Sequence, residues 1–104
     1  MTEPAAVIEV PDWATKLCNV LETKSAIDRL AARIASGEIK PDASLHYDLG
    51  VSPQELASLA YKINTDVINN FSKANPRRHV TTAELQACKK FVDLMNLVFD
   101  RLGL

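Results

Sequence analysis

The sequence is short of the residues and runs that mark several protein classes. Its 104 residues include three glycines, five prolines and two cysteines, and charged residues make up 24%. This composition is ordinary for a globular domain and unlike that of a disordered chain. No run approaches the roughly 20 apolar residues that a membrane-spanning helix needs, and the start MTEPAAVIEV lacks the basic region of a secretory signal. We therefore expect a cytoplasmic protein.

Neither sign of charge dominates. Twelve basic and thirteen acidic residues give a net charge of −1, so no global field steers the protein towards nucleic acid or anionic lipid.

Cys18 and Cys88 each lie near the apolar side of a helical segment, and we predict buried free thiols, with a disulfide as the alternative. Neither cysteine, nor His46 or His79, has a second ligand at the short spacing of zinc sites. We expect no metal and no cofactor.

What the sequence does contain is helical periodicity, strongest over 82–102. Read as one helix, this segment places its apolar residues on an arc of roughly 180°, wider than one neighbouring helix can cover. That width implies two neighbouring helices or a second copy of the protein. The residues on the arc are Leu85, Cys88, Phe91, Val92, Leu94, Met95, Val98, Phe99 and Leu102.

Helix-start and helix-stop signals divide the rest of the chain. Residues 11–36 read as a helix that either breaks or bends near Lys24, with one long helix as the alternative, and 52–72 read as the next helix. Ser52 with Glu55, and Thr81 with Glu84, have the spacing of capping boxes. Residues 1–10 read as an extended arm before a single helical domain over 11–104. The predicted fold is all-α: a small bundle of three or four helices packed around the C-terminal helix.

The stretch 44–63 resembles a helix-turn-helix of bacterial repressors. Its apolar residues and turn glycine fit that pattern at Leu45, Leu49, Gly50, Val51, Leu56 and Leu59. The resemblance implies a DNA-binding regulator that uses the turn at 45–62. The chain departs from the pattern at His46, where a small residue is usual, and it has no Arg or Lys between 53 and 61 to contact phosphates.

Two other groups of residues are candidates for binding. A loop with four basic or imidazole side chains precedes the last helix and could hold an anion or an acidic partner: Lys73, Arg77, Arg78 and His79. Lys89 and Lys90 would extend this patch. Three apolar side chains fall off the main helix stripes and are predicted to form an interface: Tyr61, Ile68 and Leu97.

Catalytic signals are few. His46 and Asp48 flank Tyr47 in one loop and could do acid–base work if they faced a pocket. No nucleophile motif, glycine-rich phosphate loop or carboxylate cluster accompanies them. The sequence therefore favours a non-enzymatic protein-interaction protein, such as an adaptor, inhibitor or accessory factor, that self-associates as a homodimer. We infer no small-molecule substrate, and the helix-turn-helix regulator is the alternative.

Overall fold

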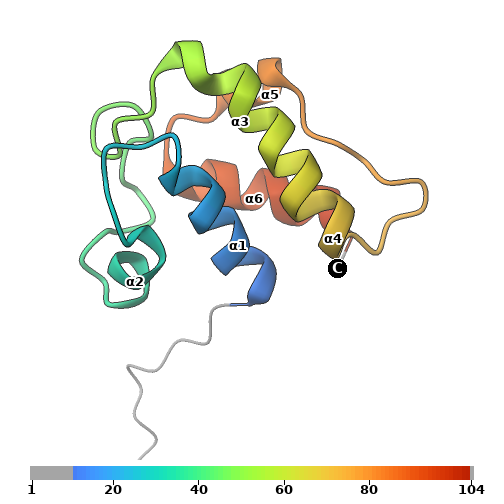
Figure 1. Ribbon diagram of the computed structural model, residues 1–104, viewed down its shortest axis with the longest axis horizontal. Coiled ribbons are helices and arrows are strands. Elements are labelled where there is room, and N and C mark those ends of the chain that lie inside the picture. The colour runs from blue at the N-terminus through green and yellow to red at the C-terminus, as the bar shows by residue number, and fades with distance from the viewer. Residues whose placement is uncertain (1–10, 104) are drawn as a thin grey trace, which may run out of the picture.

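The computed structural model describes residues 11–103, and the predicted arm over 1–10 lies outside them. The described chain is all-α, as predicted, and contains no strand. Figure 1 shows the arrangement of its helices. They are α1 (Asp12–Glu22), α2 (Leu30–Ala35), α3 (Leu56–Ile63), α4 (Asn69–Phe71), α5 (Thr82–Ala87) and α6 (Phe91–Leu102). A 3-10 turn (Pro53–Glu55) leads into α3, and a π-helical segment (Asn64–Ile68) joins α3 to α4.

Three helices build the core. α1 packs against the long helix formed by α3, the π-helical segment and α4, and α6 crosses behind both (Figure 1). The buried apolar residues form one cluster, to which α6 contributes Phe91, Leu94, Val98 and Leu102. Full burial of such a side chain stabilises the fold by about 1.5–3 kcal/mol. The C-terminal helix is therefore one of the helices that build the core.

Of the alternatives for residues 11–36, the structure has two helices with a break near Lys24. α1 ends at Glu22, and α2 begins only at Leu30. The Glu22 side chain accepts a hydrogen bond from the backbone N–H of Leu30 at 2.9 Å. This bond satisfies one of the backbone donors that every helix start leaves without a helical partner, so one helix caps the next across the break.

The prediction of one continuous helix over 82–102 is wrong, because the chain leaves the helix between α5 and α6. Around Lys89 the backbone pairs with the loop before the 3-10 turn: the N–H of Leu45 donates to the Lys89 carbonyl at 3.0 Å, and the N–H of Phe91 donates to that of Ala43 at 2.8 Å. These bonds to a distant segment replace the helical ones. Asp93 then accepts from the backbone N–H groups of Lys89 and Lys90 and caps α6.

The π-helical segment changes which side chains face the core. An i→i+5 turn adds one residue to the helix and shifts the register of everything after it. Val67 and Ile68, at the end of this segment, are both fully buried. The prediction that Ile68 is an exposed interface residue is therefore wrong, since it assumed an unbroken 3.6-residue period.

The two predicted capping boxes have different outcomes. Thr81 and Glu84 form theirs at the start of α5, as predicted. Ser52 accepts from the N–H of Gln54 and caps the 3-10 turn, but Glu55 does not complete a box. Its carboxylate pairs instead with Lys24, 3.1 Å away, and so connects the end of α1 to the start of α3.

Candidate binding groove

A groove lies between α1, α6 and the chain that follows α2. Its volume is about 740 Å³, within the range of sites that bind ligands in proteins. We call it the α1/α6 groove. It is lined by Pro11, Ala14, Cys18, Ile34, Ala35, Ser36, Gly37, Ile39, Lys40, Pro41, Phe91, Val92, Met95 and Asn96.

Small and aromatic side chains form the floor of the α1/α6 groove. Ala14 and Cys18 lie one turn apart on α1, and Phe91 begins α6; all three are at most 3% exposed. Ala14 and Cys18 are small, and neighbouring residues already cover them almost completely. Burial, and to a smaller extent the nearby Glu22 carboxylate, raises the pKa of the Cys18 thiol to about 11. The floor is therefore neutral and apolar at physiological pH.

Larger aliphatic side chains form the walls. Ile34, Ile39 and Met95 are partly exposed and pack against the edge of the core. A backbone hydrogen bond joins two of the segments that line the groove: the N–H of Val92 on α6 donates to the carbonyl of Pro41 at 2.9 Å. The groove is thus a built feature of the fold rather than a gap between loose segments.

Lys40 carries the one charge among the lining residues. It is exposed, and its ammonium group makes no ion pair with any residue between 11 and 103. An apolar groove with one cation at its edge can bury aliphatic side chains and pair with one carboxylate. The sequence analysis did not predict this site, because its walls come from three segments that are distant in the sequence. The small residues Ala14 and Cys18, one turn apart on α1, were the sequence feature that could have indicated a groove.

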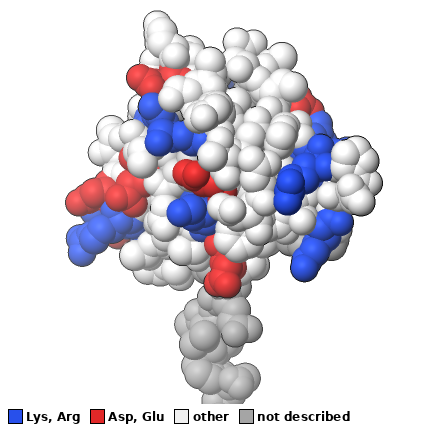
Figure 2. All heavy atoms as spheres, turned by 45° about the vertical axis from the view of Figure 1, so that its right-hand side comes forward, with Lys and Arg blue, Asp and Glu red and all other residues white. Residues whose placement is uncertain are grey.

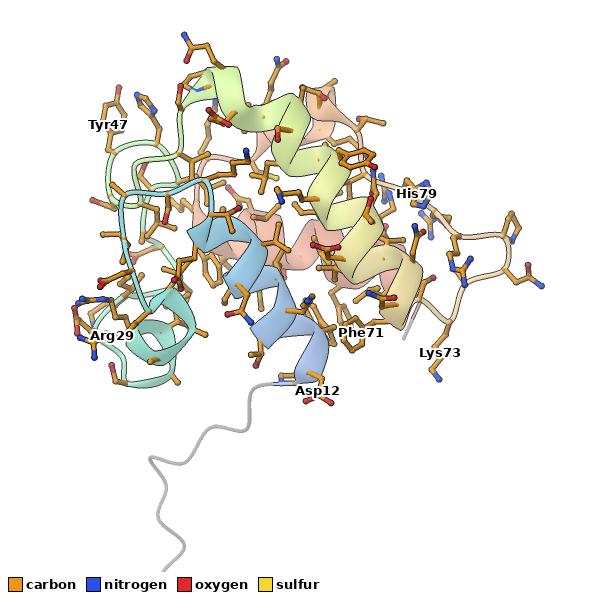
Figure 3. All side chains as sticks on the ribbon, viewed as in Figure 1. Asp12, Arg29, Tyr47, Phe71, Lys73 and His79 are labelled. Carbon is orange, nitrogen blue, oxygen red and sulfur yellow. The ribbon has the colours of Figure 1, made fainter. Side chains whose placement is uncertain are left out.

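The predicted basic loop is exposed but dispersed. Arg78 pairs with Asp100 at 3.3 Å, and His79 Nε2 lies 2.8 Å from the side-chain oxygen of Asn69. Lys73 projects from the loop towards solvent in Figure 3. Figure 2 shows the basic side chains of this side as separate groups rather than a continuous patch. Binding of an anion or acidic partner at Lys73, Arg77, Arg78 and His79 stays a prediction.

Lys89 and Lys90 do not extend that loop. Lys90 precedes the first residue of α6, whereas Arg78 contacts Asp100 near its last turn. At 1.5 Å per residue these ends are separated by roughly 14 Å. Figure 1 likewise shows the loop over 72–80 and the start of α6 on opposite sides of the molecule. The expected extension assumed the continuous helix that the structure breaks.

The predicted interface residues are not brought together on one surface. Tyr61 is 72% exposed on α3, Ile68 is buried, and Leu97 is partly buried against the core. Two exposed aromatic residues were not predicted: Tyr47, 86% exposed, and Phe99, half exposed with its ring centroid 5.9 Å from that of Trp13. Tyr47 projects from its loop in Figure 3.

The loop over 44–50 contains a short helical turn, in which the N–H of Asp48 donates to the Ser44 carbonyl at 3.1 Å. His46 and Tyr47 line one hollow together with Leu56 and Cys88, whereas Asp48 lines another. The Asp48 carboxylate accepts from the backbone N–H of Ser44 at 2.7 Å. His46 and Asp48 are therefore not assembled around one pocket. No group of three potential metal ligands gathers within 11–103.

The helix-turn-helix interpretation requires a helix immediately before the turn at Gly50. Between Ser36 and Ser52 the structure has turns and an isolated bridge but no helix. Gly50 has a φ of +74°, and a Cβ atom there would lie 2.8 Å from that of Ala26. The glycine is thus explained by close contact with the chain that follows α1, without a DNA-reading motif.

Comparisons with protein families, with curated proteins and with solved structures find no match for this chain. None of the helices within 11–103 has the length and apolar character needed to cross a membrane.

Proposed function

We propose that this is a cytoplasmic, non-enzymatic interaction protein that binds an apolar segment of a partner protein in the α1/α6 groove. One observation carries the proposal. The groove has a floor of buried apolar side chains, walls of Ile34, Ile39 and Met95, and a single charge at Lys40. Transfer of aliphatic side chains from water into such a groove is favourable by about 25 cal/mol per Å².

The groove's chemistry defines the partner segment. Two or three aliphatic side chains would pack against the partly exposed walls of Ile34, Ile39 and Met95, and a carboxylate would pair with Lys40 at the edge. Met95 is unbranched and adapts to different shapes, so the groove suits related sequences rather than one rigid ligand. The partner is therefore a protein segment of alternating or helical aliphatic residues with one acidic residue.

Selection of peptides from a random displayed library tests this proposal. We expect the enriched peptides to combine aliphatic residues with Asp or Glu, and to lose at least about tenfold in affinity for M95K, in which a charge enters the apolar wall. M95L keeps the volume and should keep the affinity. T15K places the same charge on an exposed position of α1 outside the groove and serves as the matched control.

A charge reversal tests the role of Lys40. K40E should weaken peptides with a carboxylate and favour peptides with Lys or Arg at the same position, because opposite charges at the edge set specificity. Peptides that bind M95K and K40E as well as they bind the natural chain would show that the groove is not the binding site and would overturn the proposal.

Self-association is the other part of the functional hypothesis and stays a prediction. Of the three residues predicted to form the interface, Tyr61 alone is exposed as a large apolar group. A tyrosine at such a position offers a rigid ring and a hydroxyl, a combination that is common at protein interfaces. Tyr61 is the residue at which self-association is tested in the Discussion.

A further inference from the structure

The apolar face that α6 turns towards the α1/α6 groove continues beyond it at Phe99. Val92 and Met95 line the groove and are partly exposed, and Phe99 follows Met95 by one helical turn on the same face. The Phe99 side chain is 49% exposed, and its ring centroid lies 5.9 Å from that of Trp13. Trp13 adjoins the lining residue Ala14 on α1. Phe99 therefore lies at the end of the groove that the first turn of α1 forms.

The apolar residues on this face of α6 have a spacing that a second helix can match. At 1.5 Å per residue, Met95 and Phe99 lie about 4.5 and 10.5 Å along the helix from Val92. Side chains at positions i, i+3 and i+7 of a second helix have the same separations. In a strand, the side chains of one face are about 6.7 Å apart, so the third would fall about 3 Å beyond Phe99.

We infer that the partner segment in the α1/α6 groove is an amphipathic helix that lies along α6 and packs an aromatic side chain against Phe99. This inference rests on the proposed function of the groove and specifies its partner. An amphipathic helix with its apolar face in a groove is a recurring mode of peptide recognition. Aromatic rings pack favourably at centroid separations of about 4.5–7 Å, and the exposed half of the Phe99 ring offers such a contact.

Lys40 places the acidic residue of the partner helix at the other end. Lys40 precedes Pro41, whose carbonyl accepts the backbone hydrogen bond from Val92 near the start of α6. Phe99 is seven residues, or two helical turns, further along α6. The carboxylate that pairs with Lys40 and the aromatic ring that packs against Phe99 therefore belong to opposite ends of the partner helix.

Two designed peptides of identical composition test the helical mode. The first has Leu at i and i+3, Phe at i+7, one Glu a turn before the first Leu, and Ala or Gln elsewhere; a reversed copy covers the opposite direction. The second has its apolar side chains at i, i+2 and i+4, the period of a strand. We expect the first peptide, in one of its two directions, to bind the full chain at least about tenfold more tightly in fluorescence anisotropy, because only its spacing buries all three apolar side chains. Equal affinities, or tighter binding of the second, would overturn the inference.

The contact with Phe99 is tested by pairing a variant of the chain with a variant of the peptide. F99A should weaken binding of the helical peptide about fivefold and should leave a peptide with Ala at i+7 unchanged. F99L keeps an apolar side chain next to Trp13 and should fall between the two. Y47A removes another exposed aromatic ring, outside the groove, and is the matched control. Equal losses for both peptides would overturn the contact with Phe99.

Failure of this inference differs from failure of the proposed function. Peptides that lose affinity in M95K, but that bind as well with the spacing of a strand and tolerate F99A, would overturn the helical partner and leave the groove function standing. An absence of any peptide, designed or selected, whose binding depends on Met95 would overturn the proposed function itself.

Discussion

The side-chain amide of Asn64 forms two hydrogen bonds with the backbone of Val80. Its Nδ2 donates to the Val80 carbonyl at 2.9 Å, and its Oδ1 accepts from the Val80 N–H at 2.8 Å. Asn64 is the first residue of the π-helical segment, and Val80 is a buried residue just before the cap of α5. One amide thereby connects the long helix to the end of the loop over 72–80.

Removal of this amide should destabilise the fold. In N64A both backbone groups of Val80 lose their partner, and we expect the free energy of unfolding to fall by about 2 kcal/mol, measured by urea denaturation. Asn70 is the matched control, because its amide makes a single exposed bond to the Asp66 carbonyl, and N70A should change the stability by less than about 0.5 kcal/mol. Equal effects of the two variants would contradict the structural role of Asn64.

The cap of α6 predicts a dependence on pH. Hydrogen bonds from the backbone N–H groups of Lys90 and Lys89 lower the pKa of Asp93. A carboxyl group with a lower pKa in the folded state contributes stability above its unfolded pKa of about 3.9, and this contribution disappears as the pH falls through the folded pKa. D93N should therefore melt at a lower temperature than the natural chain at pH 7, and the difference should shrink at pH 3.

A control separates this cap from general acid effects. Asp42 is exposed, and its side chain makes no hydrogen bond among the described residues, so D42N should not reproduce the pH-dependent difference. A difference between D93N and the natural chain that is the same at both pH values would count against a charged cap.

The two thiols should differ in reactivity. Cys18 is buried, whereas Cys88, which the sequence predicted as buried, is only partly covered beside the break between α5 and α6. Burial raises the pKa of both thiols, and that of Cys18 to about 11. At pH 8 iodoacetamide should modify Cys88 first and Cys18 only on unfolding, because the thiolate is the reactive form. Mass spectrometry showing equal rates would contradict the buried floor of the groove.

Periodicity was sufficient to predict the fold class, and two local events explain the errors. The predicted helix over 82–102 has the right apolar residues, but backbone hydrogen bonds to the carbonyl of Ala43 and from the N–H of Leu45, far away in the sequence, interrupt it. No pattern within 82–102 carries that information. The error at Ile68 has a similar origin. A π-helical turn shifts the register of the residues after it, and no residue type in the segment marks that shift.

The candidate site was harder to predict than the helices. Its residues come from α1, α6 and the chain after α2, and their proximity depends on the break near Lys24 and on the pairing of Val92 with Pro41. The sequence analysis instead predicted binding at a charged loop, because basic residues such as Arg77 are easily recognised in a sequence. An apolar groove uses the same residue types as the core, so only the packing distinguishes the two.

Self-association can be tested at Tyr61. Y61S removes the exposed ring without disturbing the core, so we expect it to shift a concentration-dependent dimer towards the monomer in sedimentation velocity, with an unchanged melting temperature. L97D is unsuitable for this test because Leu97 packs against the core, and a charge there should lower the stability by about 2 kcal/mol or more. A natural chain that sediments as a monomer at every concentration would contradict self-association, and a dimer unaffected by Y61S would move the interface to another surface.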